Sequence, residues 1–399
     1  MTMRRIVVVG NGIAGLTACD SLRSAGFDGE LTVVGAERHH PYSRPALSKA
    51  LLHGNDALQA HELPEPTHAA TELLGISATG LDVDARLVRL DGGGELPYDG
   101  LVIASGSRAK SLVPVQGAGV PREDGFHREL TLRTIEDAIL LKERVASRPS
   151  VIVIGGGPLG MEVASGCLHA GCEVTVVSDV KPLSRQLGAH LADIFTSAAI
   201  RRGLRVVGSG KARLIDHGAG TRVVLADGTE HAADLVVTAI GDEPNVGWLA
   251  GSDLLTNGSL RVDSRGRVRA DIVAAGDVAF FPTLRGMQRV PLWTSAIDQA
   301  KVAAVGLLQG DAAPELNFTP YFWTEGFGVS LKSVGFTPVA GTPDFCEPGR
   351  ENGSVLMRWQ NDDGSGTAAA VNYRIPIPKL RRLADAGPAA LRPAAAARV

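Results

Sequence analysis

Two glycine-rich segments of the same pattern constrain the fold more than any other feature of this chain. They are IVVVGNGIAGLTA at residues 6–18 and VIVIGGGPLGMEVA at residues 151–164. In each, an apolar strand-like run precedes three glycines at G-x-G-x-x-G spacing and a helix-like stretch. The first glycine permits a tight turn, the second lets the backbone approach a pyrophosphate, and the third lets the helix pack on the sheet. The pattern predicts two dinucleotide-binding sites.

The first glycine loop has the acidic residue that such a site needs. Its glycines are Gly10, Gly12 and Gly15, and Glu37 follows the strand-like run LTVVG. An acidic residue about 20 positions after the glycines is expected to bind the ribose hydroxyls. Strand, loop, helix, strand and acid occur in the expected order. The alternative is a tight turn in a flavodoxin-like sheet without a dinucleotide.

The second loop, with Gly155, Gly157 and Gly160, leaves the nicotinamide cofactor open. Its second strand-like run ends at Ser178, which Asp179 follows. A carboxylate at this place favours NADH, whereas a serine with Lys181 and Arg185 nearby could accept the 2′-phosphate of NADPH. Asp179 tips the prediction toward NADH.

Length and composition narrow the class of protein. At 399 residues, two or three domains are expected. The formal net charge of −3 gives no basic excess of the kind that nucleic-acid-binding proteins show. No apolar run approaches the roughly 20 residues of a membrane span. The four cysteines are too few and scattered for a disulfide scaffold, so the cytoplasm is the expected location.

The order of strand-like and helix-like runs predicts an α/β fold. Continuous Val/Ile runs, such as those at residues 6–9, 151–154 and 174–177, are typical of parallel strands covered on both faces. Short antiparallel hairpins are predicted at 87–100 and 222–236. From about residue 320 the runs alternate weakly, which indicates an antiparallel sheet. The Ala/Pro-rich end is expected to be mobile.

Two dinucleotide sites in one chain indicate a flavoprotein reductase. One site would hold a flavin dinucleotide and the other a diffusible nicotinamide, so that hydride passes between stacked rings. The flavin can then release electrons one or two at a time. No hydrolase triad and no metal-ligand cluster has comparable motif support.

Six further motifs occur along the chain. They are HHPYSRPALSKALL (39–52), LVIASGSRAK (101–110), LVVTAIGDEPN (235–245), ADIVAAGDVAFF (270–281), PLWTSAIDQA (291–300) and PYFWTEGFG (320–328). In order and spacing they resemble one family, the FAD-dependent, NAD(P)H-linked ferredoxin reductases that serve oxygenases and cytochromes P450, which include the putidaredoxin- and rubredoxin-reductase-like enzymes. The resemblance covers roughly residues 5–340.

The resemblance implies a role for each matching residue. On the FAD side, Arg108 would contact the phosphates or the adenosine, Asp277 the ribityl or phosphate region, and Trp293 the flavin pyrimidine. Lys49 would lie at the redox-active edge, where a cation stabilises the anionic reduced flavin. Glu162 could pair with Lys49 across the domain boundary. The implied catalytic residues are Lys49 and Glu162, and the implied cofactor-binding residues are Gly10, Gly12, Gly15, Glu37, Arg44, Lys49, Arg108, Asp277, Trp293, Gly155, Gly157, Gly160, Ser178 and Asp179.

Simpler interpretations stay open for several of these residues. Lys49 could be a solvated helix residue, Arg44 a member of a surface ion pair, and Asp277 a turn residue. Trp293, with Phe322 and Trp323, could form interdomain core. A glutamate in a first helical turn, as Glu162 is expected to be, is favoured by the helix dipole alone.

The sequence also departs from the family pattern. Pro291 stands where relatives commonly carry Glu, Glu325-Gly326 where they often show Asp-Gln, and Ser178 where NADH-dependent relatives usually have Glu. These departures bear on the nicotinamide preference and the docking surface of the partner protein. They do not touch the FAD motifs.

The cysteines argue against a disulfide reductase. Cys167 and Cys172 have the C-x-x-x-x-C spacing of a redox pair, but they fall within the second nucleotide unit. The expected place of such a pair holds HHPYSRPALS, so both cysteines are interpreted as buried packing residues. Electrons would then leave the flavin directly, which favours a one-electron acceptor such as an iron–sulfur protein.

The predicted architecture is α/β, with two Rossmann-like dinucleotide-binding domains, as in glutathione-reductase-like flavoproteins, and a C-terminal α+β domain. The FAD domain would comprise residues 1–110 and 242–320, the NAD(P)H domain 111–241, and the C-terminal domain with a mobile tail 321–399. The predicted enzyme passes electrons from NADH, or NADPH, through FAD to a ferredoxin. Two alternatives are an NAD(P)H oxidase or small-molecule reductase without a protein partner, and a non-catalytic signalling flavoprotein.

Overall fold

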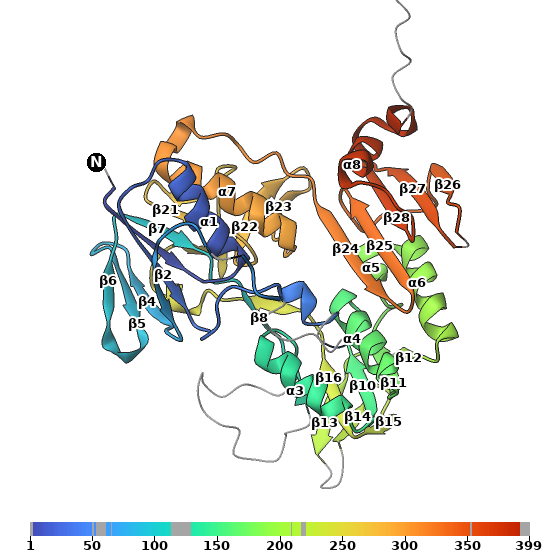
Figure 1. Cartoon of the computed structure of the whole chain (residues 1–399). Helices are drawn as coiled ribbons and strands as arrows, with labels where there is room; N and C mark the ends of the chain where they lie inside the picture. The colour runs from blue at the N-terminus through green and yellow to red at the C-terminus, as the bar shows by residue number, and fades with distance from the viewer. Residues whose placement is uncertain are drawn as a thin grey trace, which may run out of the picture. The chain divides into compact units, whose positions relative to one another are not determined.

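The computed structural model describes residues 3–49, 52, 61–64, 66–112, 129–208, 210–216, 221–351 and 353–391. The chain forms two compact units, and each is described by itself (Figure 1). The predicted limits of three domains stay a prediction, and residues 392–399 of the predicted mobile tail lie outside the described residues. The first unit comprises Met1–Ser43, Ala57–Arg108 and Glu243–Pro320; the second comprises Arg44–Asp56, Ala109–Asp242 and Tyr321–Val399.

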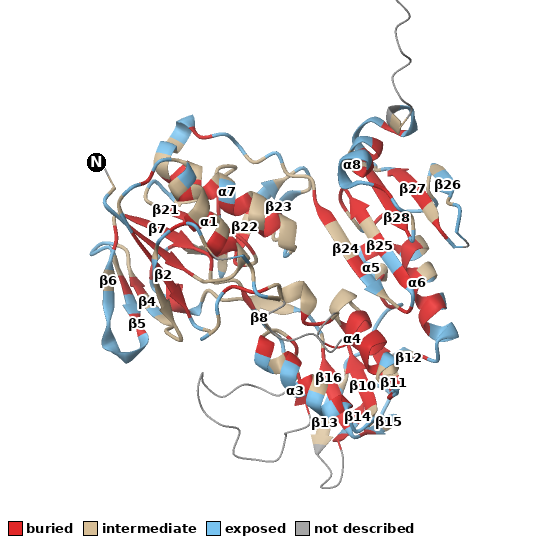
Figure 2. Ribbon diagram, viewed as in Figure 1, coloured by how far each residue is buried: buried red, intermediate tan, exposed pale blue. Residues whose placement is uncertain are grey.

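The first unit is built on a six-stranded sheet. In spatial order its strands are β20 (Arg267–Arg269), β21 (Ile272–Ala274), β7 (Gly100–Ile103), β1 (Arg5–Val9), β2 (Glu30–Gly35) and β3 (Thr71–Leu74). From β21 to β3 every neighbouring pair is parallel, and only β20 runs antiparallel to its neighbour. The central strands are buried along their length because both faces are covered, as the continuous Val/Ile runs predicted (Figure 2).

Helices cover one face of this sheet, and two small sheets, one antiparallel and one mixed, cover the other. The helices α1 (Ile13–Ser24) and α7 (Trp293–Gln309) pack together, and small residues such as Ala18, Ala300 and Ala304 share their core. On the other face, Tyr98 and Phe281 are the largest fully buried members of the core, which also contains Trp248. The strands there are β4 (Ala78–Asp82), β5 (Leu87–Leu90), β6 (Glu95–Pro97), β18 (Leu255–Thr256), β19 (Ser259–Arg261), β22 (Ala279–Thr283) and β23 (Gly286–Gln288).

The second unit contains a parallel sheet of the same type. Its strands in spatial order are β12 (Arg205–Gly208), β11 (Glu173–Ser178), β10 (Ser150–Ile154), β16 (Leu235–Thr238) and β9 (Glu129–Leu130). The three-stranded antiparallel sheet beside it comprises β13 (Arg213–Asp216), β14 (Thr221–Val224) and β15 (Glu230–Ala233). Its helices are α3 (Ile135–Val145), α4 (Pro158–His169), α5 (Ser184–Leu187) and α6 (Ala189–Arg201).

The C-terminal part of the second unit is an antiparallel sheet covered by one helix. Its strands in spatial order are β24 (Tyr321–Gly326), β25 (Val329–Val334), β28 (Gly366–Val371), β27 (Val355–Gln360) and β26 (Phe345–Pro348). Helix α8 (Ile377–Ala386) buries Leu380 and Leu383 against this sheet. The weakly alternating runs had predicted such an antiparallel sheet, and every neighbouring pair of strands is antiparallel.

Short elements complete the described part of the chain. A two-stranded sheet is formed by β8 (Ser107–Ala109) and β17 (Asp242–Pro244). None of the helices described is both long and apolar enough to cross a membrane. The 3₁₀ helices are η1 (Arg44–Ala46), η3 (Asp91–Gly93), η4 (Gly247–Leu249), η5 (Gly310–Ala312) and η6 (Pro388–Leu391).

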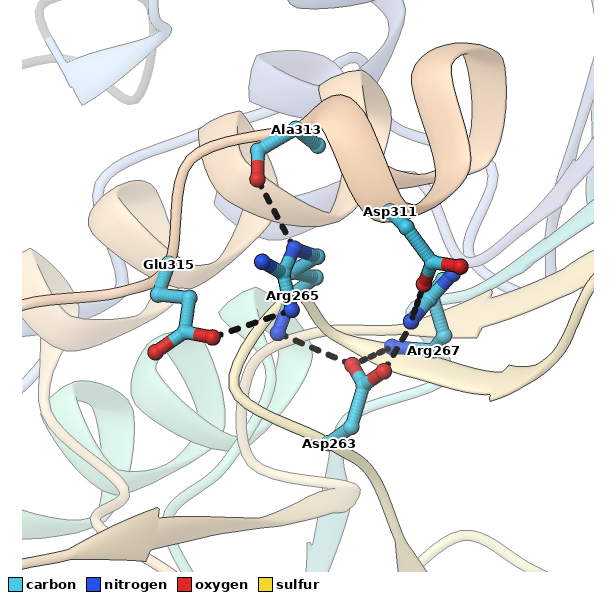
Figure 3. Close-up of polar contacts among 6 residues, drawn as sticks. All are labelled: Asp263, Arg265, Arg267, Asp311, Ala313 and Glu315. Carbon is cyan, nitrogen blue, oxygen red and sulfur yellow. Dashed lines mark hydrogen bonds and ion pairs between the residues drawn. The ribbon is translucent and has the colours of Figure 1, made fainter.

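A charged cluster in the first unit, the Asp263 cluster, ties the turn before β20 to the chain after α7 (Figure 3). The Asp263 carboxylate accepts hydrogen bonds from the backbone N–H groups of Arg265 and Arg267, at 2.8 and 2.9 Å, and from Arg267 Nε at 2.8 Å. Arg267 also pairs with Asp311 at 2.7 Å, and Arg265 pairs with Glu315 at 3.0 Å. These contacts join residues far apart in sequence within one unit.

Candidate functional site

The first glycine loop has the shape that its spacing predicted. Gly10 has φ of 118°, and a Cβ there would lie 2.1 Å from the carbonyl oxygen of Ala104. A Cβ on Gly15 would lie 1.8 Å from the carbonyl oxygen of Gly10. Helix α1 can therefore pack on the loop only if this position has no side chain. At Gly12 a Cβ would meet no atom within 4 Å. The backbone at Gly12 therefore faces open space.

The second loop repeats this geometry in the other unit. Gly155 has φ of 113°, and a Cβ there would lie 2.2 Å from the carbonyl oxygen of Ala239. A Cβ on Gly160 would lie 2.0 Å from the carbonyl oxygen of Gly155. At Gly157 the nearest atom to an added Cβ is Gln186 Nε2, at 3.7 Å. The tight turn, the close helix packing and the approachable middle glycine recur.

Both helices that follow these loops begin in a way that suits an anion. Gly12 is the N-cap of α1 and Gly157 that of α4, and neither helix has a side-chain cap or an acidic residue in its first turn. The first backbone N–H groups of a helix lack partners within it and carry a partial positive charge. With open space at Gly12 and only the end of the Gln186 side chain near Gly157, the residues present fit a dinucleotide pyrophosphate at each loop.

Of the other residues predicted on the FAD side, Glu37, Arg108, Asp277 and Trp293 lie in the first unit, whereas Arg44 and Lys49 lie in the second. Several of them already have protein partners. Glu37 is half-buried beyond β2, and its carboxylate accepts a 2.5 Å hydrogen bond from the buried hydroxyl of Tyr42. Arg108 is exposed and pairs with Glu243 at 2.7 Å. A ribose on Glu37 would share the carboxylate with Tyr42. The roles of both residues stay predictions.

Asp277 and Trp293 lie in the same unit, at the end of β21 and the start of α7. Gly276, with φ of 81°, makes the turn that places Asp277, and its N–H donates to the buried Gln299 Oε1 at 2.9 Å. The Asp277 carboxylate accepts a 3.2 Å hydrogen bond from Ser107 Oγ. Trp293 is half-buried as the first residue of α7. Their contacts with a flavin stay predictions.

The most developed polar site in the second unit, the Glu162 cluster, surrounds one buried carboxylate. Glu162 is 5% exposed on α4. Lys49 Nζ lies 2.9 Å from both of its oxygens, so the expected ion pair is present. Ser48 Oγ donates to Oε2 at 2.5 Å, and Thr324 Oγ1 donates to Oε1 at 2.6 Å. Three donors from two chain segments thus satisfy the carboxylate, as a buried charge requires.

The Glu162 cluster excludes two of the simpler interpretations, those of Lys49 and of Glu162. The Lys49 side chain is 14% exposed, so it is not a solvated surface lysine. Glu162 lies beyond the first turn of α4, which holds no acidic residue, so the helix dipole does not account for its position. Arg44, in the same unit, is half-buried and donates to the backbone oxygen of Arg133 at 2.8 Å.

A cavity of about 790 Å³ opens beside Lys49 within the second unit. Its wall brings together the end of α4, the residue after α6 and the turn between β24 and β25. Three basic side chains, Lys49, His169 and Arg202, face one acidic side chain, Glu325. The ammonium group of Lys49 is therefore reachable from solvent, although its carboxylate partner is buried.

At the end of β11, Ser178 and Asp179 occupy different environments. Ser178 is 7% exposed, and a Cβ added to Gly156 would lie 2.6 Å from its hydroxyl oxygen. Asp179 is exposed and pairs with Arg185 at 2.8 Å. Lys181 pairs with Asp193 on α6. Both cations proposed for a 2′-phosphate thus already contact a carboxylate.

All four cysteines are free thiols in the structure: Cys19, Cys167 and Cys172 are buried, and Cys346 is exposed. Burial, with a smaller contribution from Cys172, raises the pKa of the Cys167 thiol to about 12. Burial also raises the pKa of Cys172, against the opposing charge of Arg148. Such thiols are unreactive at neutral pH. Within the described ranges, no group of His, Cys, Asp and Glu could hold a metal ion.

Comparison with known proteins now decides the family. Residues 4–300 match the model of the pyridine nucleotide-disulphide oxidoreductases. The chain belongs to this family. It is 34% identical to rhodocoxin reductase of Rhodococcus erythropolis, over 84% of this chain and 79% of that protein. It is also 34% identical to the anthranilate 1,2-dioxygenase system ferredoxin–NAD(+) reductase component of Burkholderia cepacia, over 97% and 95% of the two chains.

A solved structure agrees over most of the chain. The covalent complex of putidaredoxin reductase with putidaredoxin matches with a TM-score of 0.79 and 26% identity, over 92% of this chain and 90% of that chain. The predicted family, the α/β fold with two Rossmann-like sheets and the assignment as an oxidoreductase are confirmed. The predicted cofactors, FAD and NADH, are also supported by the family.

The sequence interpretation missed four residues that complete these sites. Ser48 and Thr324 stand inside the motifs RPALSK and PYFWTEGFG, so their proximity to Lys49 and Trp323 in sequence was a usable signal. Tyr42 also lies within a quoted motif. Asp193 lies on α6, outside every motif, and only the fold places it beside Lys181.

Proposed function

We propose that this enzyme takes electrons from NADH and passes them through FAD to a small iron–sulfur ferredoxin that serves a cytochrome P450 or an oxygenase. The observation that carries this proposal is the pair of glycine loops of equal geometry, one in each unit, with helix N-termini open to a pyrophosphate. The names of the relatives support the acceptor, since two are a rhodocoxin reductase and a ferredoxin–NAD(+) reductase component.

The chain's own residues would bind and orient the two cofactors. Gly10, Gly12 and Gly15 would hold the FAD pyrophosphate, with Glu37 on the ribose. Gly155, Gly157 and Gly160 would do the same for NADH. FAD, when bound, supplies the conversion between two-electron and one-electron transfer. Each loop contributes backbone N–H groups without a side chain that would block the approach.

Lys49 would supply a fixed positive charge at the reacting edge. Glu162 holds the ammonium group at 2.9 Å, and Ser48 and Thr324 keep the carboxylate satisfied, so the lysine cannot rotate freely into solvent. A cation fixed before reaction stabilises developing negative charge without reorganisation cost. Because the cluster is built from three segments of the second unit, its geometry does not depend on one flexible loop.

The preference for NADH is supported by the charges beyond β11. Asp179 and Asp193 contact Arg185 and Lys181, the two cations that a 2′-phosphate would need. The proposed location is the cytoplasm, which the four cysteines support, because none of them forms a disulfide and three are buried.

The first test is an anaerobic titration of the purified FAD-loaded enzyme with NADH and, separately, NADPH, followed by the visible spectrum. We expect NADH to bleach the flavin band at about one equivalent, because FAD accepts one hydride. The reduced enzyme should then reduce a ferredoxin from an oxygenase system faster than it reduces oxygen or a quinone. Equal rates with oxygen would favour a stand-alone oxidase, and no bleaching by either nucleotide would refute the reductase.

A thiol titration tests whether electrons leave without a redox disulfide. Three of the four cysteines are buried, so we expect one thiol, that of Cys346, to react with a disulfide reagent in the native enzyme. All four should react in denaturant. Cys346→Ser should remove the native reaction and leave electron transfer unchanged. Rapid labelling of Cys167 or Cys172 after reduction by NADH would contradict the proposal.

A further inference from the structure

Four charged side chains lie beside the second glycine loop. They are Asp179 after β11, Lys181 and Arg185 in the following segment, and Asp193 on α6. The dinucleotide-binding pattern, which has an acidic residue after its second strand, explains only Asp179. The inference drawn from them rests on the proposed function, because it assumes that this loop binds the nicotinamide nucleotide.

The segment that carries these charges packs directly on the loop. The N–H of Leu183 donates to the carbonyl oxygen of Gly156 at 2.7 Å. A Cβ on Gly156 would lie 3.0 Å from Pro182 Cα as well as 2.6 Å from Ser178 Oγ. Gln186 lies next to Gly157. The adenosine end of a nucleotide whose pyrophosphate sits on this loop would therefore meet the segment from Ser178 to Gln186.

Ser178 itself is poorly placed to select the coenzyme. Its side chain is buried against Gly156, and 7% of the residue is exposed. The charged groups beyond it are accessible instead, since between 43% and 62% of each side chain of the four is exposed. Discrimination between a ribose 2′-hydroxyl and a 2′-phosphate thus falls to these groups.

The four charges cancel in two ion pairs. Arg185 pairs with Asp179 at 2.8 Å, and Lys181 pairs with Asp193. A 2′-phosphate carries about −1.5 to −2 charges at neutral pH. Free cations would strengthen binding of this phosphate. Here, however, each cation already contacts a carboxylate, and both carboxylates repel the phosphate. A 2′-hydroxyl has no charge and is not affected in this way.

We infer that Asp179 and Asp193 determine the choice of NADH over NADPH by neutralising Arg185 and Lys181. The two cations form a phosphate site that the carboxylates keep closed. Asp193 need not touch the coenzyme, so it is a positioning residue that acts through Lys181. Removing one carboxylate is sufficient to release its cation and also removes one charge that repels the phosphate.

The test measures binding without redox chemistry. The FAD-loaded enzyme and its Asp193→Asn variant are titrated in a calorimeter with ADP-ribose and with 2′-phospho-ADP-ribose. We expect Asp193→Asn to improve the affinity for 2′-phospho-ADP-ribose about tenfold relative to ADP-ribose, since it frees one cation and removes one repelling charge. Adding Asp179→Asn should increase the ratio further. Adding Lys181→Met to Asp193→Asn should abolish the gain.

A matched control separates this local effect from the change in net charge. Glu230 forms an exposed ion pair with Arg222 at 2.8 Å on the three-stranded sheet of the same unit. Glu230→Gln alters the net charge equally and should leave the ratio of affinities unchanged. An equal gain in this variant, or none in Asp193→Asn, would overturn the inference. Failure of the wild-type enzyme to bind ADP-ribose would instead refute the proposed nicotinamide site.

Discussion

The two charged clusters, one in each unit, contain similar groups but differ in their exposure to solvent. The Glu162 cluster holds one carboxylate that is 5% exposed, and its three donors are Ser48, Lys49 and Thr324. In the Asp263 cluster, by contrast, the Asp263 side chain is 38% exposed and that of Asp311 is 91% exposed (Figure 3). Water can replace protein partners in the Asp263 cluster, but it has little access to the Glu162 cluster.

The difference separates a structural role from a candidate functional one. In the Asp263 cluster, two of the three hydrogen bonds to Asp263 come from backbone N–H groups of its own turn, so the cluster shapes the chain locally. In the Glu162 cluster all donors are side chains, and Lys49 also lines a cavity. A buried carboxylate is costly unless it is fully paired. The buried Glu162 carboxylate pairs with Lys49, which lines the cavity, and this supports a function beyond stability.

Breaking the Glu162 cluster should have the largest effect on stability. Glu162→Ala leaves the ammonium group of Lys49 and two buried hydroxyl groups without their acceptor. We expect the free energy of unfolding to fall by about 3–5 kcal/mol, as for the loss of one partner of a buried ion pair. Urea unfolding of the FAD-free enzyme measures it. A loss below about 1 kcal/mol would place this cluster in the same class as exposed pairs.

Lys49→Met tests the function of the same cluster. It keeps a side chain of similar length and removes the cation. We expect the rate of flavin reduction by NADH to fall about a hundredfold, with FAD content unchanged, because a fixed charge near developing negative charge is worth this much. Anaerobic stopped-flow absorbance measures the rate. Lys379→Met, at an exposed position of α8, is the control and should leave it unchanged.

Asp263→Asn tests the structural cluster and should have an intermediate effect. Partial burial raises the pKa of Asp263, but hydrogen bonds from Arg267 and Arg265 and the charge of Arg267 outweigh it, so the pKa lies below its usual value. The charged form therefore stabilises the fold above the unfolded-state pKa of about 4, and this stabilisation is lost as the pH falls through the lower folded-state value.

At neutral pH we expect Asp263→Asn to lower the free energy of unfolding by about 1–2 kcal/mol, because it weakens hydrogen bonds to a charged acceptor. The difference from the wild type should shrink as the pH falls below about 4. Urea unfolding at several pH values measures both. Flavin reduction by NADH should not change. A difference that is constant with pH would contradict the role of the charge.

Sequence patterns predicted local features well, for reasons visible in the structure. Gly10 and Gly155 have a positive φ and leave no room for a Cβ, so each of these two positions admits glycine only. Strands buried on both faces need continuous apolar runs, which the sequence shows directly. Lys49 and Glu162 came from the family resemblance, since no spacing rule relates residues more than a hundred positions apart.

The remaining features depend on tertiary packing. Asp193 meets Lys181, and Thr324 meets Glu162, only because α6 and β24 are placed by the whole second unit. The burial of Ser178 against Gly156 likewise follows from how the segment after β11 folds back. Side-chain contacts of this kind leave no periodic signal, so a single sequence indicates the residues but not their partners.

The smallest expected effect on stability concerns Asp311, the most exposed carboxylate of the two clusters. Asp311 pairs with Arg267 at 2.7 Å, shorter than the contact between Lys49 and Glu162, yet its side chain is 91% exposed. If distance decided the energy, Asp311→Asn would be more harmful than loss of the contact between Lys49 and Glu162. We expect it to lower the free energy of unfolding by less than about 0.5 kcal/mol, because water solvates the carboxylate almost fully and salt screens the pair. Urea unfolding at low and high salt measures it. A loss comparable to that of Glu162→Ala would mean that geometry, rather than burial, governs both clusters.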